Sequence, residues 1–191
     1  RIRCSNTYRY LPVLGATNKR SVLMFKVKPW LSITLLVAAL FQINAHAQSS
    51  RLEVELTLAD LNVQPYHRPY VAVWLETPER KHVTTLALWV QKAEWFKDLR
   101  QWWRKAGKSN AQFDGVSGAT KRAGTYTISW DGNDLNGNPV TPGKYLLNIE
   151  VVREEGGRDY SRIELDLTQS EKITIEGKNE FTTSFVTVSA R

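Results

Sequence analysis

One short run in this chain, Asp114 to Thr120, holds residue types that could do chemistry together. It reads D-G-V-S-G-A-T. The Thr120 hydroxyl is a nucleophile that can accept a phosphoryl group, and in phosphoryl transfer proteins contribute mainly positioning and charge neutralisation. Gly118 and Ala119 add no bulk beside it, so we expect the hydroxyl to be open to the active site of a second protein. The alternative interpretation is an ordinary surface turn rich in Gly, Ser and Asp.

The run fits the pattern D-x-x-[ST]-G-A-[ST], which resembles the acceptor motif of bacterial flavin transferases. The resemblance implies that FMN is attached covalently to Thr120 through a phosphoester, with AMP leaving from FAD. It also implies that Asp114, Ser117, Gly118 and Ala119 complete the cofactor-binding loop, with Asp114 orienting the loop or approaching a metal held by the transferase. A flavin transferase is therefore an expected partner.

Two residues outside the run are candidates for contact with the cofactor. His67 and Arg68 stand just before a predicted strand, and an arginine fork suits a phosphate because it donates two parallel hydrogen bonds. The alternative is a proline-containing entry to a strand with solvated side chains. We predict no metal site, because the histidines show no ligand spacing. The Asp/Asn-rich run 131–138 departs from an EF-hand loop at Leu135.

The beginning of the chain has the pattern of a secretory signal peptide. Basic residues precede an apolar run of about twelve residues, Trp30–Phe41, and an A-x-A site ends at Ala47. Such a run is too short to cross ~30 Å of hydrocarbon as a helix. We expect cleavage after Ala47 and a soluble periplasmic product. The expected divisions are an upstream segment, 1–23, a signal peptide, 24–47, and a single domain, 48–191.

Removal of the signal peptide changes the charge of the chain. Seven of the 26 basic residues and none of the 19 acidic ones lie in residues 1–47, which leaves 19 of each. The mature part is therefore neutral, and its charge gives no support for binding to nucleic acid or to a membrane surface. The only cysteine, Cys4, is also removed, so disulfides and thiolate chemistry are excluded from the mature part.

The rest of the mature sequence predicts an all-β protein. Short segments of alternating or apolar residues are separated by turn residues, which is typical of an antiparallel, immunoglobulin-like β-sandwich. Tyr70–Glu76 is apolar on both faces and is predicted to be a central strand, forming a hairpin with the next. The predicted strands are Arg51–Leu58, Tyr70–Glu76, Val83–Val90, Thr125–Trp130, Lys144–Val152, Tyr160–Leu167, Lys172–Ile175 and Phe181–Val188.

One segment, about 93–105, has helical rather than strand periodicity. Its aromatic and aliphatic residues recur at helical spacing and form one stripe, which favours an inserted amphipathic helix. We expect the stripe to belong to the core, and the alternative is a wall for a cofactor. The stripe consists of Trp95, Phe96, Leu99, Trp102 and Trp103. The Gly/Ser/Asn-rich segment 108–124, which contains the acceptor motif, is predicted to be a surface loop.

Two further resemblances bear on fold and function. The run from Trp130 to Tyr145, W-D-G-N-D-L-N-G-N-P-V-T-P-G-K-Y, resembles the hairpin of the immunoglobulin-like domain in flagellar hook-capping proteins. The stretches Y-H-R-P-Y-V-A-V-W, L-R-Q-W-W-R and D-G-V-S-G-A-T resemble a DUF family of predicted periplasmic bacterial proteins associated with flavin-transferase systems and PepSY-type membrane redox proteins. That resemblance implies electron transfer across the envelope.

These observations lead to one functional expectation and one alternative. The expected function is a periplasmic electron carrier with FMN on Thr120, in which a PepSY-type partner supplies the contact with the membrane. The alternative is a cofactor-free, immunoglobulin-like binding module. A stand-alone enzyme is less favoured, because no Ser-His-Asp set, pair of catalytic carboxylates or phosphate-binding loop is recognisable in the sequence.

Overall fold

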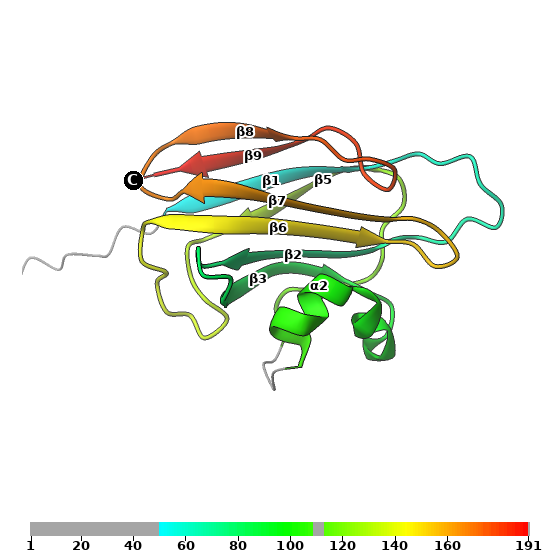
Figure 1. Cartoon of the computed structure of the whole chain (residues 1–191), viewed down its shortest axis with the longest axis horizontal. Helices are drawn as coiled ribbons and strands as arrows, with labels where there is room; N and C mark the ends of the chain where they lie inside the picture. The colour runs from blue at the N-terminus through cyan, green and yellow to red at the C-terminus, as the bar shows by residue number, and fades with distance from the viewer. Residues whose placement is uncertain (1–49, 109–112, 191) are drawn as a thin grey trace, which may run out of the picture. The chain divides into compact units, whose positions relative to one another are not determined.

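The computed structural model describes residues 50–108 and 113–190, all of which belong to one compact unit. The predicted upstream segment, signal peptide and cleavage site lie outside the described residues. Two β-sheets face each other, and short helical segments cover one outer surface (Figure 1). The strands are β1 (Arg51–Leu58), β2 (Tyr70–Glu76), β3 (His82–Trp89), β4 (Ser117–Gly118), β5 (Gly124–Trp130), β6 (Lys144–Val152), β7 (Arg158–Asp166), β8 (Glu171–Ile175) and β9 (Ser184–Ser189).

The predicted all-β sandwich is confirmed. One sheet has the strand order β5-β1-β9-β8 and the other has the order β4-β3-β2-β6-β7. All the pairings are antiparallel except that of β3 with β4, which is parallel. The alternation in β1 places Leu52, Val54 and Leu56 in the core between the sheets, with at most 1% of each exposed. Burial of alternate residues is what a strand with one solvated face requires.

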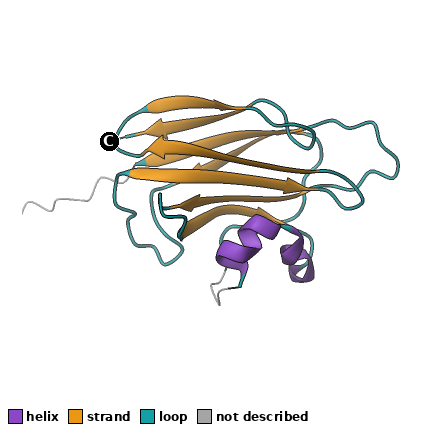
Figure 2. Ribbon diagram, viewed as in Figure 1, coloured by secondary structure: helices purple, strands orange, loops and turns teal. Residues whose placement is uncertain are grey.

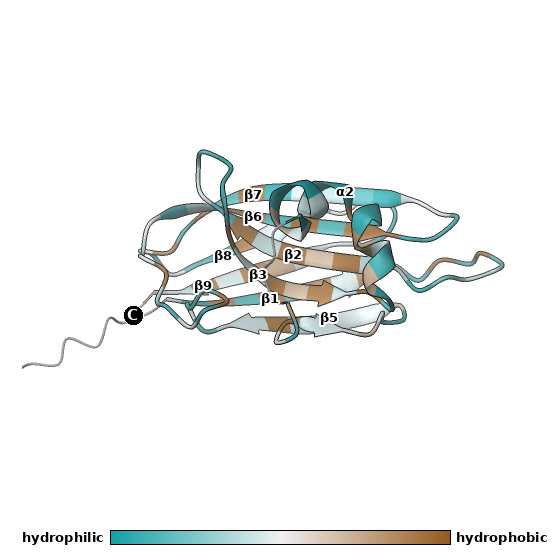
Figure 3. Cartoon of the chain, turned by 90° about the horizontal axis from the view of Figure 1, so that it is seen from below, coloured by the Kyte–Doolittle hydropathy of each residue, from teal (hydrophilic) through white to brown (hydrophobic). Residues whose placement is uncertain are grey.

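β2 is the central strand that its sequence predicts, because both of its faces are buried. Val71, Val73 and Leu75 point into the core between the sheets, and β2 forms the predicted hairpin with β3. Tyr70, Ala72 and Trp74 point to the opposite side, where the helical segments cover them. Figure 3 shows the apolar residues of β2 and β3 as a band beneath those segments.

The predicted continuous helix at 93–105 is corrected by the structure. Three short segments replace it: a 3-10 segment η1 (Ala93–Asp98), an α-helical turn α2 (Arg100–Trp102) and a π-helical turn η2 (Trp103–Gly107) (Figure 2). The break falls at Leu99, whose ψ of 71° is not helical. The fully buried carboxylate of Glu150, on β6, provides a physical reason for the break. It accepts hydrogen bonds from the backbone N–H groups of Gln101 (2.9 Å) and Trp102 (3.0 Å) and so fixes a new helix start.

The prediction that the apolar stripe belongs to the core is confirmed for its central residues. Leu99 and Trp102 are fully buried, whereas Trp95, Phe96 and Trp103 are only partly buried. Together with Tyr70, Ala72, Trp74 and Leu88 they form a second cluster, the outer cluster, on the face of the sheet that points away from the sandwich core. The helical insert is therefore held by its own apolar core rather than by the main one.

The W-D-G run does not join paired strands. β5 pairs with β1 in one sheet and β6 pairs with β2 in the other, so residues 131–143 form a crossover between the sheets. Within the crossover, Asn133 and Pro139 form an isolated bridge, and Asp134 accepts hydrogen bonds from the backbone N–H groups of Asn136 and Asn138, both at 2.8 Å. Its Asp and Asn side chains thus stabilise a turn.

Some strand boundaries also differ from the predictions. β7 begins at Arg158 rather than Tyr160, and β9 begins at Ser184 rather than Phe181. Phe181 makes only an isolated bridge with Leu58, yet it is 1% exposed. Its apolar character therefore reflects burial at the sandwich edge rather than membership of the last strand.

Asp159 of β7 is expected to make the stability of the protein depend on pH. Its Oδ2 accepts backbone N–H bonds from Lys178 (2.9 Å), Asn179 (2.7 Å), Glu180 (2.9 Å) and Phe181 (3.4 Å). Burial acts to raise the pKa of Asp159, but these four bonds favour the anion and lower the pKa below its usual value. The unfolded chain then binds the proton more readily, so the stability that Asp159 contributes is present above pH ~4 and is lost as the pH falls further.

The measurement is urea unfolding of the wild type and of Asp159→Asn between pH 7 and pH 2.5. We expect the substituted protein to be less stable at pH 7, and the difference between the two proteins to shrink as the pH falls below ~4. A difference that stays constant over this range would show that the charge of Asp159 does not matter.

Candidate functional site

Residues 114–120, the acceptor segment, begin beside a buried anchor. Phe113 is 7% exposed and packs edge-on against Trp102, with 5.0 Å between the ring centroids. Its carbonyl accepts hydrogen bonds from the backbone N–H groups of Val116 (3.0 Å) and Ser117 (2.8 Å). The outer cluster therefore fixes where the acceptor segment starts, and a tight turn lifts Asp114 and Gly115 into solvent.

The acceptor segment lies at the surface as the sequence predicts, but it is not entirely a loop, because its centre forms a short edge strand. β4 runs parallel to β3, and hydrogen bonds join Leu88 N to Val116 O and Val90 N to Gly118 O, each at 2.9 Å. A Cβ on Gly118 would lie 3.4 Å from Cδ1 of Trp89, an ordinary van der Waals contact, so the segment packs beside that ring without requiring glycine. A two-residue strand has no periodicity, which is why sequence patterns cannot reveal it.

Thr120 does not have the exposed hydroxyl that the sequence predicts. Asp114, Ser117, Gly118 and Ala119 are exposed, but only 4% of Thr120 is. The Gln91 side-chain amide, which follows β3, donates a hydrogen bond of 3.2 Å to the Thr120 hydroxyl. The chain turns here from β4 towards β5 in the opposite sheet, and this turn brings Thr120 inwards. The small neighbours of Thr120 expose the backbone beside it without exposing the hydroxyl.

The residue that follows Thr120, Lys121, lies over two aromatic rings. Trp89 and Tyr126 meet edge to face with 5.6 Å between their ring centroids. The Lys121 ammonium lies 4.8 Å from the centroid of each ring, within the range of a cation–π contact. The sequence gave no reason to single out Trp89, Tyr126 or Gln91. Only the convergence of β3, β4 and β5 brings them together.

The structure does not bring His67 to the acceptor segment. His67 lies beside the turn that follows β6, with 3.7 Å from its Nδ1 to Glu154 Oε2 and 4.0 Å from its Nε2 to Glu155 Oε2. Arg68 is exposed. β6 is on one side of β2 in the sheet, and β3 and β4 are on the other. The histidine and the acceptor segment therefore belong to opposite flanks of the central strand.

The described part of the chain contains neither a cluster of metal-ligating side chains nor a membrane-spanning helix. Within residues 50–108 and 113–190, no group of three or more His, Cys, Asp or Glu side chains is placed to hold a metal ion. No helix among those residues is long and apolar enough to span a bilayer.

The fold and the acceptor segment define a class of protein: a two-sheet β-sandwich that carries a helical insert on one outer face and a two-residue edge strand, Ser117–Gly118, on one sheet. The sequence profile of a family described as "Predicted periplasmic protein (DUF2271)" matches residues 51–183. The chain belongs to this family of predicted periplasmic proteins. Comparison with curated proteins and with solved structures found no match to the chain.

Proposed function

We propose that the mature protein is a periplasmic electron carrier with FMN joined to Thr120 through a phosphoester. The observation that carries the proposal is the D-G-V-S-G-A-T run itself, which stands at the edge of a sheet with five of its first six residues exposed. The flavin would perform the redox chemistry, while the protein supplies attachment and environment. A PepSY-type membrane protein is the proposed electron-transfer partner.

The attachment is a phosphoryl transfer catalysed by the flavin transferase. The Thr120 oxygen attacks the phosphorus next to the riboflavin part of FAD. The new oxygen–phosphorus bond forms as the bond to AMP breaks, and the hydroxyl proton passes to a base of the transferase. AMP leaves, and the flavin keeps its oxidation state. The chain contributes the hydroxyl and a segment that the active site of the transferase can bind.

Because Thr120 is buried, the acceptor segment must open for this reaction. The segment is held by two backbone hydrogen bonds to β3 and by the bond from Gln91 to Thr120. At ~0.5–1.5 kcal/mol net for each bond, their loss costs about 1.5–4.5 kcal/mol. Local openings of this size occur at sheet edges in folded proteins. A transferase can therefore reach the hydroxyl without unfolding the sandwich.

The surroundings of Thr120 suit a tethered flavin. Tyr126 is partly exposed and offers aromatic surface, whereas Trp89 is buried in the main core, and Lys121 carries a positive charge next to the attachment residue. Once the segment opens, the Lys121 ammonium can leave the two rings and offset the phosphoester charge.

One observation favours the alternative, a cofactor-free binding module. A threonine that is 4% exposed and hydrogen-bonded to Gln91 has a structural role that needs no flavin. Under this alternative, the acceptor segment only seals the edge of β3, which would otherwise present unpaired backbone groups.

The experiment that separates the two functions is co-expression with a periplasmic flavin transferase. The carrier predicts a yellow protein whose colour survives denaturation and whose intact mass increases by one FMN less one water. The control is a known acceptor protein expressed in the same cells. If that acceptor is labelled and this chain is not, the carrier function is wrong and the binding module is favoured.

A further inference from the structure

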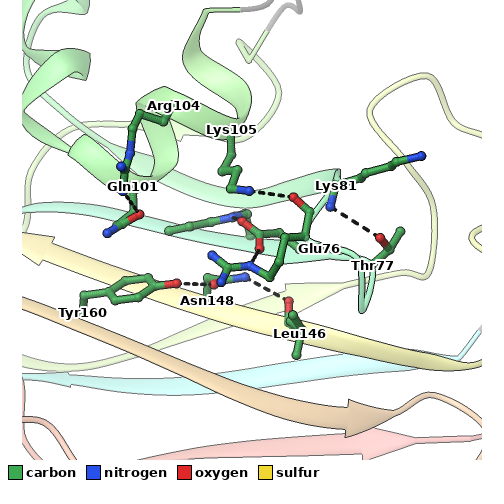
Figure 4. A network of polar contacts seen from close by, with 11 residues as sticks. Glu76, Thr77, Lys81, Gln101, Arg104, Lys105, Leu146, Asn148 and Tyr160 are labelled. Atoms are coloured by element: carbon green, nitrogen blue, oxygen red, sulfur yellow. Dashed lines mark hydrogen bonds and ion pairs between the residues drawn. The ribbon is translucent and has the colours of Figure 1, made fainter.

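A second site lies beneath the helical insert, away from the acceptor segment. A cleft of about 490 Å³ opens between the helical segments α2 and η2 and the outer face of β7. Figure 4 shows Lys105 reaching down from the helical segment, with Tyr160 on the strand below. The lining residues are Arg80, Gln101, Arg104, Lys105, Tyr160 and Arg162. Four of the six are cations, and they come from a turn, a helical segment and a strand.

Most of this positive charge is not neutralised. Arg80 pairs with Glu76, but Lys105 donates to the neutral carbonyl of Arg80 at 2.7 Å, and Arg104 donates to the neutral amide of Gln101. Arg104, Lys105 and Arg162 make no ion pair with any acidic residue in the described ranges. The cleft is therefore strongly positive in a mature chain whose basic and acidic residues are equal in number.

The acidic residues around the cleft do not cancel that charge. Glu76 is fully buried, and its two oxygens are occupied by Arg80 and by the Trp74 indole N–H (2.9 Å). Glu164 lies two residues from Arg162 on β7, where it is exposed and lines a neighbouring hollow that shares Arg80 and Arg162 with this cleft. Any ligand in the cleft thus meets an excess of cations.

The floor of the cleft is held rigidly in place. Arg80 has a φ of 67°, a left-handed conformation that is uncommon for a residue with a side chain, and the buried Glu76 fixes its guanidinium. The Tyr160 hydroxyl donates a 2.7 Å hydrogen bond to the fully buried Asn148. The hairpin turn and the buried Glu76 therefore hold the Arg80 guanidinium at a fixed place in the cleft.

We propose that this cleft binds a small oxyanion with two or more negative charges, carried by a phosphate- or carboxylate-bearing solute. The arginine forks can donate paired hydrogen bonds to oxyanions, and Lys105 adds a point charge. The site is independent of the proposed flavin. Arg80 precedes β3 and Gln91 follows it, so the length of that strand, about 25 Å, separates the cleft from Thr120.

The test is calorimetric titration of flavin-free periplasmic protein with pyrophosphate and, separately, with citrate at constant ionic strength. We expect saturable binding of at least one anion, and the preferred one identifies the ligand chemistry as phosphate or carboxylate. Lys105→Gln and Arg162→Gln should each weaken binding by about tenfold or more, the usual effect of losing a hydrogen bond to a charged group. Thermal melts will show that each variant remains folded.

Arg51→Gln provides the matched control, because it removes the same charge from an exposed position on β1 in the opposite sheet. Its affinity should stay within about twofold of the wild type, because charges more than ~10 Å apart are largely screened. Absence of saturable binding for both anions would overturn the proposal. Equal weakening by Arg51→Gln and Arg162→Gln would overturn it too, because binding would then reflect net charge alone.

Discussion

Replacing Thr120 with alanine should abolish covalent flavin attachment, because the substitution removes the only oxygen through which the proposed phosphoester can form. Thr120→Ser should retain labelling, since it keeps the hydroxyl. Thr127→Ala is the matched control: it removes the hydroxyl of an exposed threonine on β5, outside the motif, and should be labelled like the wild type. Intact mass and peptide mapping after co-expression with a flavin transferase are the measurements.

The burial of Thr120 adds a second, kinetic expectation to this experiment. Gln91→Ala removes the hydrogen bond that holds the hydroxyl inwards, so labelling should become faster without a change in its site. Thr120→Ala should also cost about 1 kcal/mol of stability, more than a typical surface change, because a buried hydrogen bond is lost. Full labelling of Thr120→Ala would contradict attachment at this residue, and slower labelling of Gln91→Ala would contradict the need for opening.

The largest expected effect on stability comes from Trp102→Ala. This side chain is fully buried, its indole N–H donates to the Thr85 hydroxyl at 3.0 Å, and its ring packs against Phe96 and Phe113. We expect the free energy of unfolding to fall by about 3–5 kcal/mol, as it does when a well-packed aromatic residue is truncated. Urea unfolding followed by circular dichroism measures the change.

Two variants give this prediction its controls. Trp103→Ala should lower the free energy of unfolding clearly less, because Trp103 is only partly buried. The helical stripe in the sequence predicted both tryptophans to be core residues. Trp102→Phe keeps most of the packing but loses the hydrogen bond to Thr85, so its cost should be intermediate. Equal unfolding midpoints for Trp102→Ala and the wild type would mean that the outer cluster does not stabilise the domain.

Trp102 also links the helical insert to the acceptor segment. Its contact with Phe113 anchors the point where that segment starts. Loosening the outer cluster should therefore loosen the segment as well, and Trp102→Ala protein that remains folded should be labelled faster than the wild type. Hydrogen exchange at Leu88 and Val90, whose N–H groups bond to the segment, would report the same loosening directly.

Local patterns in the sequence were enough to predict the class of fold. The burial predicted from the alternation in β1 and from the apolar run of β2 was confirmed. Successive side chains of a strand point to opposite faces, so the sequence pattern shows which faces are buried. The stripe on the insert identified Leu99 and Trp102 as core residues, because residues at helical spacing lie on one face of a helix. What failed was the continuity of the helix, which is set by Glu150, a residue almost fifty positions away on β6.

The sequence alone determined that the protein is an all-β domain and that the run of residues 114–120 ends in a threonine. Only the tertiary structure decided that this threonine is buried against Gln91, that the motif pairs with β3, and that His67 lies on the other flank of β2. Likewise, the cations of the oxyanion cleft come from three separate places in the chain. Periodicity reports which face of an element is buried, whereas the neighbours of a side chain depend on how distant elements pair, and no local pattern encodes that.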